Sequence, residues 1–238
     1  MATFVIVHGG WGGGWEWRHV ANELIRLGHA ALTPTLTGLG ERSHLLAPSI
    51  TLDTHAADVT GLLEWERLDD AILVGHSYGG MVTTVAATDT PDRIRALIYV
   101  DAFIPMDGQR EIDLIDGEWV DEHILRPARV SGDGWLVPFP FPDDVGELTP
   151  DDAERYRNSI HPLATFTGPA RVGDHVAGIP SAFVPCTRKA PGDDAFAESL
   201  RIALERDWPI REISSGHDVQ LEDPRGAAAI LHELSTIL

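Results

Sequence analysis

Cysteine is almost absent from this chain of 238 residues, which carries Cys186 alone. A single cysteine forms neither an internal disulfide nor a thiolate cluster for zinc, so we expect no metal site. Long apolar runs are absent too, since no window approaches the ~18 uninterrupted apolar residues of a membrane helix. The opening segment has neither the basic stretch nor the cleavage site of a secretion signal. We therefore expect a cytoplasmic protein that does not enter a membrane.

Positive charge is also scarce. Lysine and arginine number 18 against 37 aspartate plus glutamate residues, for a net charge of −19, and Lys189 is the only lysine. A field of this sign repels phosphate backbones and anionic lipid, which excludes nucleic acid as a partner. The hydrophobic share of 43% and the charged share of 23% are those of a globular chain, and the length fits a single domain over residues 1–238. The oligomeric state is left open, and a homo-oligomer is allowed.

Short β-branched runs alternate with helix-like stretches along most of the chain. This alternation predicts the α/β class, with a mostly parallel central sheet flanked by helices, because the runs are apolar on both faces. The predicted strands are Thr3–His8, Ala30–Pro34, Ala71–Val74, Ala96–Asp101, Ser181–Cys186 and Ile210–Ile213. The predicted helices are Trp15–Leu27, Asp53–Leu68, Gly79–Thr88, Asp193–Arg206 and Pro224–Leu238.

One interval, from about residue 104 to 179, interrupts this alternation. It is rich in proline and acidic residues, with Pro138, Pro140 and Pro142 close together, and has only short amphipathic pieces. Long excursions in compact domains are usually lids or binding elements. We therefore expect an insertion that forms a lid over the sheet, with a surface loop without function as the alternative.

A serine lies in the sequence Gly75-His76-Ser77-Tyr78-Gly79, directly after a predicted strand and before a predicted helix. This is the Gly-x-Ser-x-Gly pattern in the strand–turn–helix context that it requires. The turn is so sharp that the flanking positions must lack side chains. It also presents the hydroxyl at a helix N-terminus, whose partial positive charge stabilises a developing oxyanion. We predict that Ser77 is a nucleophile.

A nucleophilic serine needs a base, and the order of such motifs places it near the C-terminus. Among the 11 histidines, His217 lies in a short loop between the last predicted strand and the last predicted helix. A loop at the carboxyl end of a strand reaches the edge where Ser77 lies. His232 falls inside the last helix, where we expect it to pack or face solvent. We predict that His217 is the base.

The first predicted strand ends in the glycine-rich run His8-Gly9-Gly10-Trp11. Neither Gly-x-Gly-x-x-Gly nor Gly-Lys-Ser/Thr fits this run, so we expect no phosphate-bearing cofactor, and none of another kind. Glycines instead allow a backbone amide to approach a substrate carbonyl. We expect an oxyanion hole made by the amides of Gly10 and Tyr78, the residue after the nucleophile. We expect His8 to be structural.

These motifs together resemble the α/β-hydrolase superfamily, and within it the branch of small bacterial esterases, plant methyl esterases and hydroxynitrile lyases. The resemblance covers the whole chain and implies the α/β-hydrolase fold with a lid insertion. It is carried by His8-Gly-Gly, Trp15-x-Trp17, Leu36-Thr-Gly-Leu-Gly-Glu-Arg, Gly75-His-Ser-Tyr-Gly-Gly and Gly216-His-Asp.

The chain departs from these relatives at the acid of a Ser–His–acid triad. In the plant members the acid follows a Cys-Thr pair by two residues, and here Lys189 occupies that position. A lysine cannot orient an imidazole or stabilise the imidazolium. Other α/β-hydrolases carry the acid one strand earlier, where this chain has Asp101. A carboxylate that ends such an apolar strand is costly to bury without a partner.

We therefore predict Asp101 as the triad acid, with Asp193 and Asp194 as alternatives. Asp218 is badly placed because it adjoins the base. The lyases of this branch use a lysine after the catalytic histidine and a threonine after the histidine of the first loop. Here those positions are Asp218 and Gly9, so the groups that distinguish cyanohydrin cleavage are absent.

The predicted function is that of a serine esterase acting on a small, largely apolar substrate through an acyl-enzyme. Trp11, Phe103 and Trp135 are the expected pocket residues, from a wider set of aromatics that includes Trp119, Phe139 and Phe141. Three alternatives on the same fold are a carbon–carbon bond hydrolase, a lyase and a cofactor-free oxygenase. A non-enzymatic receptor for a small ligand is a fourth.

Overall fold

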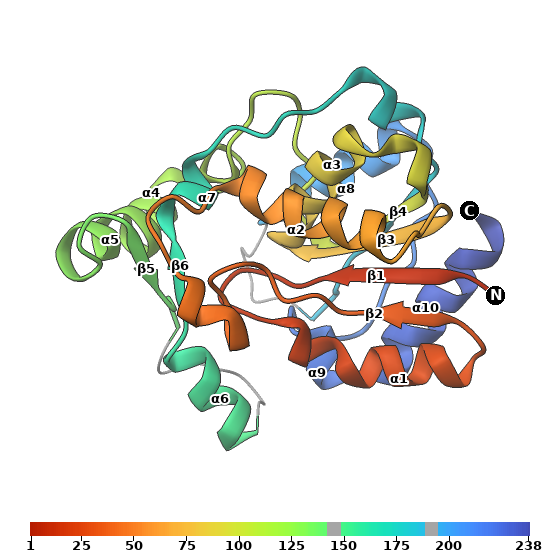
Figure 1. Cartoon of the computed structure of the whole chain (residues 1–238), viewed down its shortest axis with the longest axis horizontal. Coiled ribbons are helices and arrows are strands. Elements are labelled where there is room, and N and C mark those ends of the chain that lie inside the picture. The colour runs from red at the N-terminus through yellow and green to blue at the C-terminus, as the bar shows by residue number, and fades with distance from the viewer. Residues whose placement is uncertain (142–148, 189–194) are drawn as a thin grey trace.

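The computed structural model describes residues 1–141, 149–188 and 195–238. Within them a five-stranded parallel sheet forms the centre, in the order β2-β1-β3-β4-β7 (Figure 1). The strands are β1 Thr3–Val7, β2 Ala30–Leu32, β3 Ala71–Ser77, β4 Ile94–Ala102 and β7 Ser181–Val184. The predicted parallel sheet is confirmed, and β3 extends to include the predicted nucleophile.

The sixth predicted strand, Ile210–Ile213, is wrong as a continuous strand. It meets the chain at the end of β7 only through two isolated parallel bridges, at Ile210 and at Ile213. Between them, the Arg211 amide donates to the Phe183 carbonyl and the Ile213 amide to the Pro185 carbonyl. Proline has no N–H to donate, so the ladder lacks the bond that would join the two bridges.

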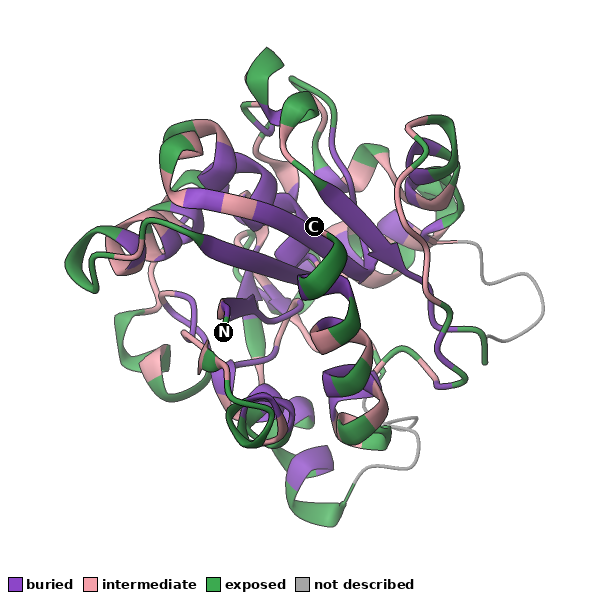
Figure 2. Ribbon diagram, turned by 90° about the vertical axis from the view of Figure 1, so that its right-hand side faces the viewer, coloured by how far each residue is buried: buried purple, intermediate pink, exposed green. Residues whose placement is uncertain are grey.

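Helices cover both faces of the sheet (Figure 1). On one face lie α1 Arg18–Arg26 and α10 Pro224–Ile237, and on the other lie α2 Leu52–Trp65, α3 Gly79–Asp89 and α8 Ala197–Glu205. Successive strand residues therefore enter two cores: Phe4 and Ile6 pack in the core of α1 and α10, whereas Val5 and Val7 pack in the core of α2 and α3. Figure 2 shows the strands buried between these layers, which explains their continuous apolar runs.

The five predicted helices are present; α3 and α10 begin at the predicted Gly79 and Pro224, and the other three begin elsewhere than predicted. The helix predicted from Trp15 begins as a 3₁₀ turn, Gly14–Trp17, before α1 starts. The helix predicted from Asp193 appears as α8 from Ala197, and residues 189–194 lie outside the described part of the chain. The remaining short pieces outside the insertion are α9 Val219–Glu222 and the 3₁₀ turns Gly40–Leu45 and Pro91–Arg93.

Most of the insertion, residues 104–179, lies beyond the carboxyl ends of the strands, and its last part runs back over α3 (Figure 1), where the Gly173 amide donates to the Thr88 hydroxyl at 3.1 Å. Its strands β5 Leu136–Pro138 and β6 Ile160–Pro162 form a separate antiparallel pair. Its helices are α4 Gly117–Val120, a π-helical turn Asp121–Leu125, α5 Arg126–Ser131, α6 Pro150–Arg157 and α7 Leu163–Thr167, with 3₁₀ turns at Glu111–Asp113 and Asp174–Gly178. A lid function for the insertion remains a prediction.

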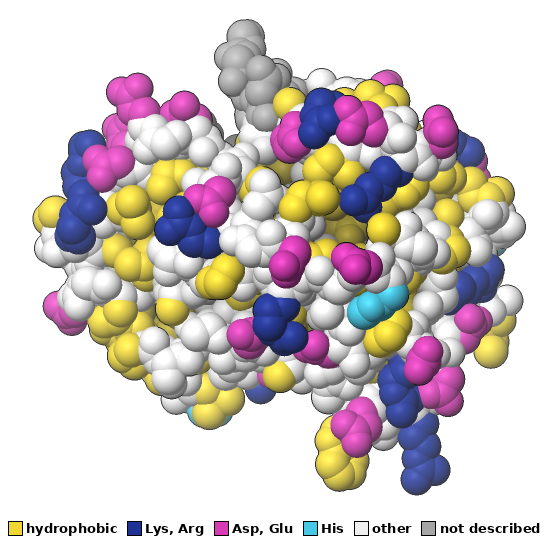
Figure 3. Space-filling view, turned by 90° about the horizontal axis from the view of Figure 1, so that it is seen from above, with side chains coloured by type: hydrophobic (Ala, Val, Ile, Leu, Met, Phe, Trp, Pro, Cys, Tyr) yellow, Lys and Arg dark blue, Asp and Glu magenta, His cyan; other side chains and the backbone are white. Residues whose placement is uncertain are grey.

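Charged side chains of both signs lie side by side on the face shown in Figure 3. Arg171 of the insertion, for example, pairs with Asp53 of α2 at 2.9 Å and with Asp89 of α3 at 3.0 Å. Such pairs tie the insertion to the helices beneath it. Among the described residues, no helix combines the length and the apolar character needed to cross a bilayer.

Candidate active site

Ser77 ends β3 in a left-handed conformation, with φ of 53°. This conformation is strained for a residue with a side chain and is typical of functional turns. The chain then enters α3, and close packing explains the glycines around the turn. A Cβ on Gly79 would overlap the carbonyl oxygen of Val7, and one on Gly80 would overlap that of Phe103. The predicted strand–serine–helix turn is therefore present.

His217 and Asp101 form a hydrogen-bonded pair beside this turn. The imidazole Nδ1 lies 2.8 Å from a carboxylate oxygen of Asp101, which is the next-to-last residue of β4 and is 1% exposed. The other carboxylate oxygen accepts from the Cys186 amide at 3.3 Å. Because a carboxylate only accepts hydrogen bonds, the proton of the neutral imidazole lies on Nδ1, which leaves the Nε2 lone pair to act as a base.

The sheet register brings Ser77 to this pair. Ser77 lies opposite Ala102 in the pairing of β3 with β4, directly after Asp101. The ring of His76, the residue before Ser77, lies 4.6 Å from the ring of His217, and its Nε2 donates to the His217 carbonyl at 2.9 Å. The three residues predicted for a triad thus lie on adjoining segments at the carboxyl ends of β3 and β4, and their action as a triad remains a prediction.

The structure gives no position for the two alternative acids. Asp193, Asp194 and Lys189 all lie outside the described residues. Asp218 turns to another group, since its carboxylate accepts from Gln220 at 3.3 Å and from the Tyr156 hydroxyl at 3.5 Å. The hydrogen bond from His217 favours Asp101, and its catalytic role remains a prediction.

The predicted oxyanion donors occupy two segments next to Ser77. Gly10 lies in the loop after β1, and Tyr78 directly precedes α3. Among the described residues, no acceptor takes a hydrogen bond from either backbone amide. A Cβ on Gly9 would lie 3.1 Å from the Ser77 Cβ, which shows how closely the glycine loop approaches the serine. Both segments thus adjoin Ser77, and an oxyanion hole made by the two amides remains a prediction.

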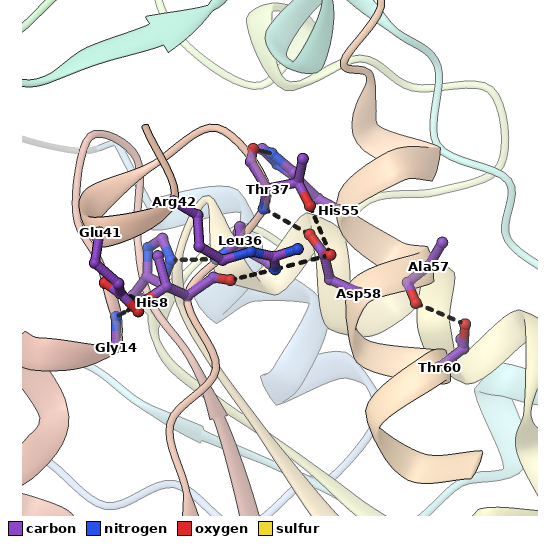
Figure 4. A network of polar contacts seen from close by, with 11 residues as sticks. His8, Gly14, Leu36, Thr37, Glu41, Arg42, His55, Ala57, Asp58 and Thr60 are labelled. Carbon is purple, nitrogen blue, oxygen red and sulfur yellow. Dashed lines mark hydrogen bonds and ion pairs between the residues drawn. The ribbon is translucent and has the colours of Figure 1, made fainter. Parts of the chain in front are cut away.

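Buried hydrogen bonds support this loop from beneath (Figure 4). His8 donates from Nδ1 to the Gly9 carbonyl at 2.8 Å. At Nε2 it accepts from the Leu36 amide at 3.1 Å, as Figure 4 shows. Burial lowers the pKa of His8 to about 4, so the ring is neutral at physiological pH. This arrangement agrees with a structural role for His8.

The same network orients Tyr78. His55 donates from Nε2 to the Thr37 carbonyl at 2.9 Å, so its Nδ1 accepts from the Tyr78 hydroxyl at 2.8 Å. Asp58 binds both the amide and the hydroxyl of Thr37, at 2.6 and 2.7 Å, and pairs with Arg42 at 3.0 Å (Figure 4). The ring of Tyr78, the residue predicted to supply the second amide, is therefore fixed.

The three predicted pocket residues have different surroundings. Trp11 lines a cavity of about 440 Å³, together with residues of the Gly38–Leu46 segment and of the insertion. None of the three residues predicted for the triad lines this cavity, and neither does Trp135. Phe103 is buried 4.7 Å from Phe196, a ring centroid distance typical of packed aromatics. The assignment of all three to a substrate pocket remains a prediction.

Sequence reasoning missed several residues that touch the site. Phe196 stacks on the His217 ring at 5.2 Å with an interplanar angle of 11°. His161 of β6 accepts a hydrogen bond from the Trp11 amide at 3.0 Å. Glu16 is buried, and burial, reinforced by Asp218, raises its pKa well above the usual value. No local pattern marks Phe196 and His161, because their partners His217 and Trp11 lie far away in the chain. Glu16 also accepts from the nearby Gly13 amide, but the burial that raises its pKa comes from the folded chain.

The described ranges contain no group of three or more histidine, cysteine or acidic side chains arranged to hold a metal ion.

Comparison with known proteins gives concordant matches. A family model described as the alpha/beta hydrolase family matches residues 4–230. A carbendazim hydrolyzing esterase of Nocardioides sp. is 53% identical over 115 residues, which is 48% of each chain, so this match spans about half of that relative. Methylesterase 7 of Arabidopsis thaliana is 34% identical over 253 residues, 98% of this chain and 95% of the relative.

Among solved structures, an extracellular alpha/beta-hydrolase from a Paenibacillus species superposes with a TM-score of 0.84 at 25% identity, covering 98% of this chain and 99% of the other. That protein is described as sharing structural and functional homology with the tobacco salicylic acid binding protein 2.

Proposed function

This chain belongs to the alpha/beta hydrolase family, and from that premise we propose that it cleaves a carboxylic ester of a small, largely apolar substrate through an acyl-enzyme on Ser77. Its esterase relatives make it an enzyme of the serine-hydrolase type. The observation that supports the acyl-enzyme mechanism is the 2.8 Å hydrogen bond between His217 and the buried carboxylate of Asp101. It lies at the carboxyl ends of the strands, where Ser77 adopts its left-handed conformation.

In the acylation step, the Ser77 hydroxyl oxygen attacks the ester carbonyl while Nε2 of His217 takes the hydroxyl proton. Asp101 keeps the other imidazole proton on Nδ1 and stabilises the imidazolium, an interaction strengthened because the carboxylate is shielded from water. The amides of Gly10 and Tyr78 donate to the oxyanion of the tetrahedral intermediate. When the intermediate collapses, the imidazolium returns the proton to the leaving alcohol.

Deacylation repeats this sequence with water as the nucleophile. His217 removes a proton from water, the acyl carbonyl passes through a second oxyanion, and Ser77 leaves with its proton restored. The step needs no group beyond the residues already named. The Nocardioides relative is named for the hydrolysis of carbendazim and the Arabidopsis relative as a methylesterase, so both kinds of ester belong in a substrate screen.

The test combines labelling with turnover. A fluorophosphonate reagent should modify Ser77 in the native protein, as located by peptide mass spectrometry, and short p-nitrophenyl esters should be hydrolysed. Ser77→Ala should abolish both. Ser131→Ala, which changes an exposed serine of α5, should alter neither. A folded wild-type protein that is not labelled at Ser77, or that binds a small ligand tightly without turnover, would refute the proposal and favour a receptor.

A further inference from the structure

Trp11 follows the first oxyanion donor, Gly10, and has a strained backbone. Its φ is 59°, in the left-handed region that residues with a large side chain rarely adopt. Such a conformation persists only where surrounding contacts enforce it. The contacts that enforce it here come from the insertion and not from the loop itself.

Two hydrogen bonds hold Trp11, one at its backbone and one at its side chain. The amide N–H donates to Nδ1 of His161 at 3.0 Å. The indole N–H donates to the carbonyl oxygen of Val137 at 2.8 Å. Val137 lies in β5 and His161 in β6, and the two residues are opposite each other in the antiparallel pairing of these strands. One cross-strand pair of the β5–β6 hairpin, Val137 and His161, therefore binds both the indole and the backbone amide of Trp11.

His161 is built into this position. It is fully buried, its ring stacks on Phe166 at 4.4 Å, and it meets the ring of Tyr78 edge-on at 5.1 Å. A Cβ on Gly10 would lie 3.8 Å from its Nδ1. The ring is thus packed between the two segments that carry the predicted oxyanion donors.

The protonation state of His161 follows from its surroundings. Burial lowers its pKa well below the usual value, and the histidines at positions 55 and 8 lower it further, so the ring is neutral. Since Nδ1 accepts from Trp11, the proton lies on Nε2, which has no hydrogen-bond partner among the described residues. A phenylalanine at this position would not bury an unpaired N–H, so the histidine carries a free-energy cost that an apolar ring lacks. What the histidine provides in return is the Nδ1 acceptor for the Trp11 amide.

We propose that the β5–β6 hairpin of the insertion sets the geometry of the oxyanion hole, with His161 as the positioning residue. By accepting from the Trp11 amide, His161 fixes the plane of the peptide that joins Gly10 to Trp11. The Gly10 amide itself lies in the preceding peptide, whose Gly9 carbonyl accepts from His8. Gly10 has no side chain to restrict its own backbone torsions, so these two restraints on either side of it together fix the direction of its amide. The inference rests on the proposed function and adds to it: the insertion shapes the catalytic centre as well as covering it.

Two substitutions separate the acceptor from the packing. His161→Phe keeps a ring of similar size and removes the acceptor. His161→Asn loses part of the ring but places an amide oxygen near the position of Nδ1, where it can accept from Trp11. His123→Phe is the matched control, because His123 also lies in the insertion and stacks on an aromatic ring, that of Trp119.

We expect His161→Phe to lower kcat about 10- to 100-fold with KM changed less than threefold, somewhat less than the about 10²- to 10³-fold loss on removal of an oxyanion donor. His161→Asn should recover most of the loss, and His123→Phe should match the wild type. A boronic acid that forms a tetrahedral adduct with Ser77 should lose affinity in parallel with kcat/KM. A planar amide analogue of the substrate should bind all four proteins equally.

The outcomes distinguish this inference from the proposed function. Absence of turnover and of Ser77 labelling in the wild type would refute the proposed function itself. An active wild type with His161→Phe within twofold of it would refute only the role of His161. The same conclusion follows if His161→Asn falls as far as His161→Phe while both keep the wild-type thermal midpoint, or if the loss lies in KM alone.

Discussion

Replacing Asp101 by asparagine is the sharpest perturbation of the candidate triad, because it changes one atom and leaves the shape unchanged. Within the described part of the chain, the carboxylate accepts from His217 at 2.8 Å and from the Cys186 amide at 3.3 Å. An asparagine side chain supplies one acceptor and one donor in their place. The Cys186 amide can only donate, whereas an imidazole can exchange its two tautomers. The amide oxygen should therefore face Cys186, and the NH₂ group should face His217.

This orientation places the imidazole proton on Nε2, the atom that must accept the Ser77 proton. The base is then unavailable in the ground state, and the imidazolium loses its buried counter-charge. A substitution of this kind in a serine protease triad lowers kcat about 10⁴-fold, which corresponds to about 5.4 kcal/mol in activation free energy. Because both hydrogen bonds are retained in altered form, we expect the free energy of unfolding to change by no more than about 1 kcal/mol.

Initial rates of p-nitrophenyl acetate hydrolysis test this expectation, with Ser77→Ala setting the background. Asp193→Asn and Asp194→Asn serve as matched controls for the alternative acids and should keep near wild-type rates. Thermal unfolding checks that each variant is folded. Turnover of Asp101→Asn within tenfold of the wild type would refute the assignment. So would a loss in either control equal to that of Asp101→Asn.

Two further predictions concern packing and pH. Gly79→Ala should destabilise the fold by about 1–3 kcal/mol and reduce activity, because the added Cβ would overlap the Val7 carbonyl oxygen and lie 2.7 Å from the His8 carbonyl oxygen. Gly61→Ala in α2, where nothing lies near the added Cβ, should be neutral or stabilising in the same thermal melts. Equal effects of the two substitutions would contradict the packing argument. Glu16 has a pKa raised well above 4.5 by burial and by Asp218, so its contribution to stability is present at low pH and is lost as pH rises from about 4.5 through the folded-state pKa. In urea titrations, the unfolding free energy of the wild type should fall between pH 5 and 8, and Glu16→Gln should make that fall smaller by up to about 1.4 kcal/mol per pH unit. If the unfolding free energy of Glu16→Gln falls with pH as steeply as that of the wild type, the buried carboxyl does not titrate as argued.

The turn at Ser77 was predictable because its constraints are local. A strand that passes into a helix through one residue needs a glycine at position 75, where a Cβ would meet the backbone of Gly79 and Gly80 in the same turn. The glycine at position 79 fits the same local pattern, although the atoms that a Cβ there would overlap belong to Val7 and His8. The same holds for the parallel sheet, whose continuous apolar runs require cover on both faces. The predicted strand Ile210–Ile213 shows the limit of such patterns. Its own sequence suits a strand, and the interruption comes from Pro185, a residue of the neighbouring segment.

The predicted acid of the candidate triad depends on both the sequence and the tertiary structure. Lys189 at the expected acid position made a different carboxylate necessary, and Asp101 was the choice that also suited a buried strand end. The partner of that carboxylate is 116 residues away, and only the folded chain places it there. The contact between Trp11 and His161 spans 150 residues and has no counterpart in any local motif.

By itself, the sequence determined the α/β class, the serine turn and the glycine loop beside it, because backbone sterics and the periodicity of apolar residues act over a few residues. Only the tertiary structure decided which acid His217 contacts, which ring stacks on that histidine, and how the insertion holds Trp11. These choices depend on the docking of segments far apart in the chain, where the free energy comes from burial and from hydrogen bonds shielded from water.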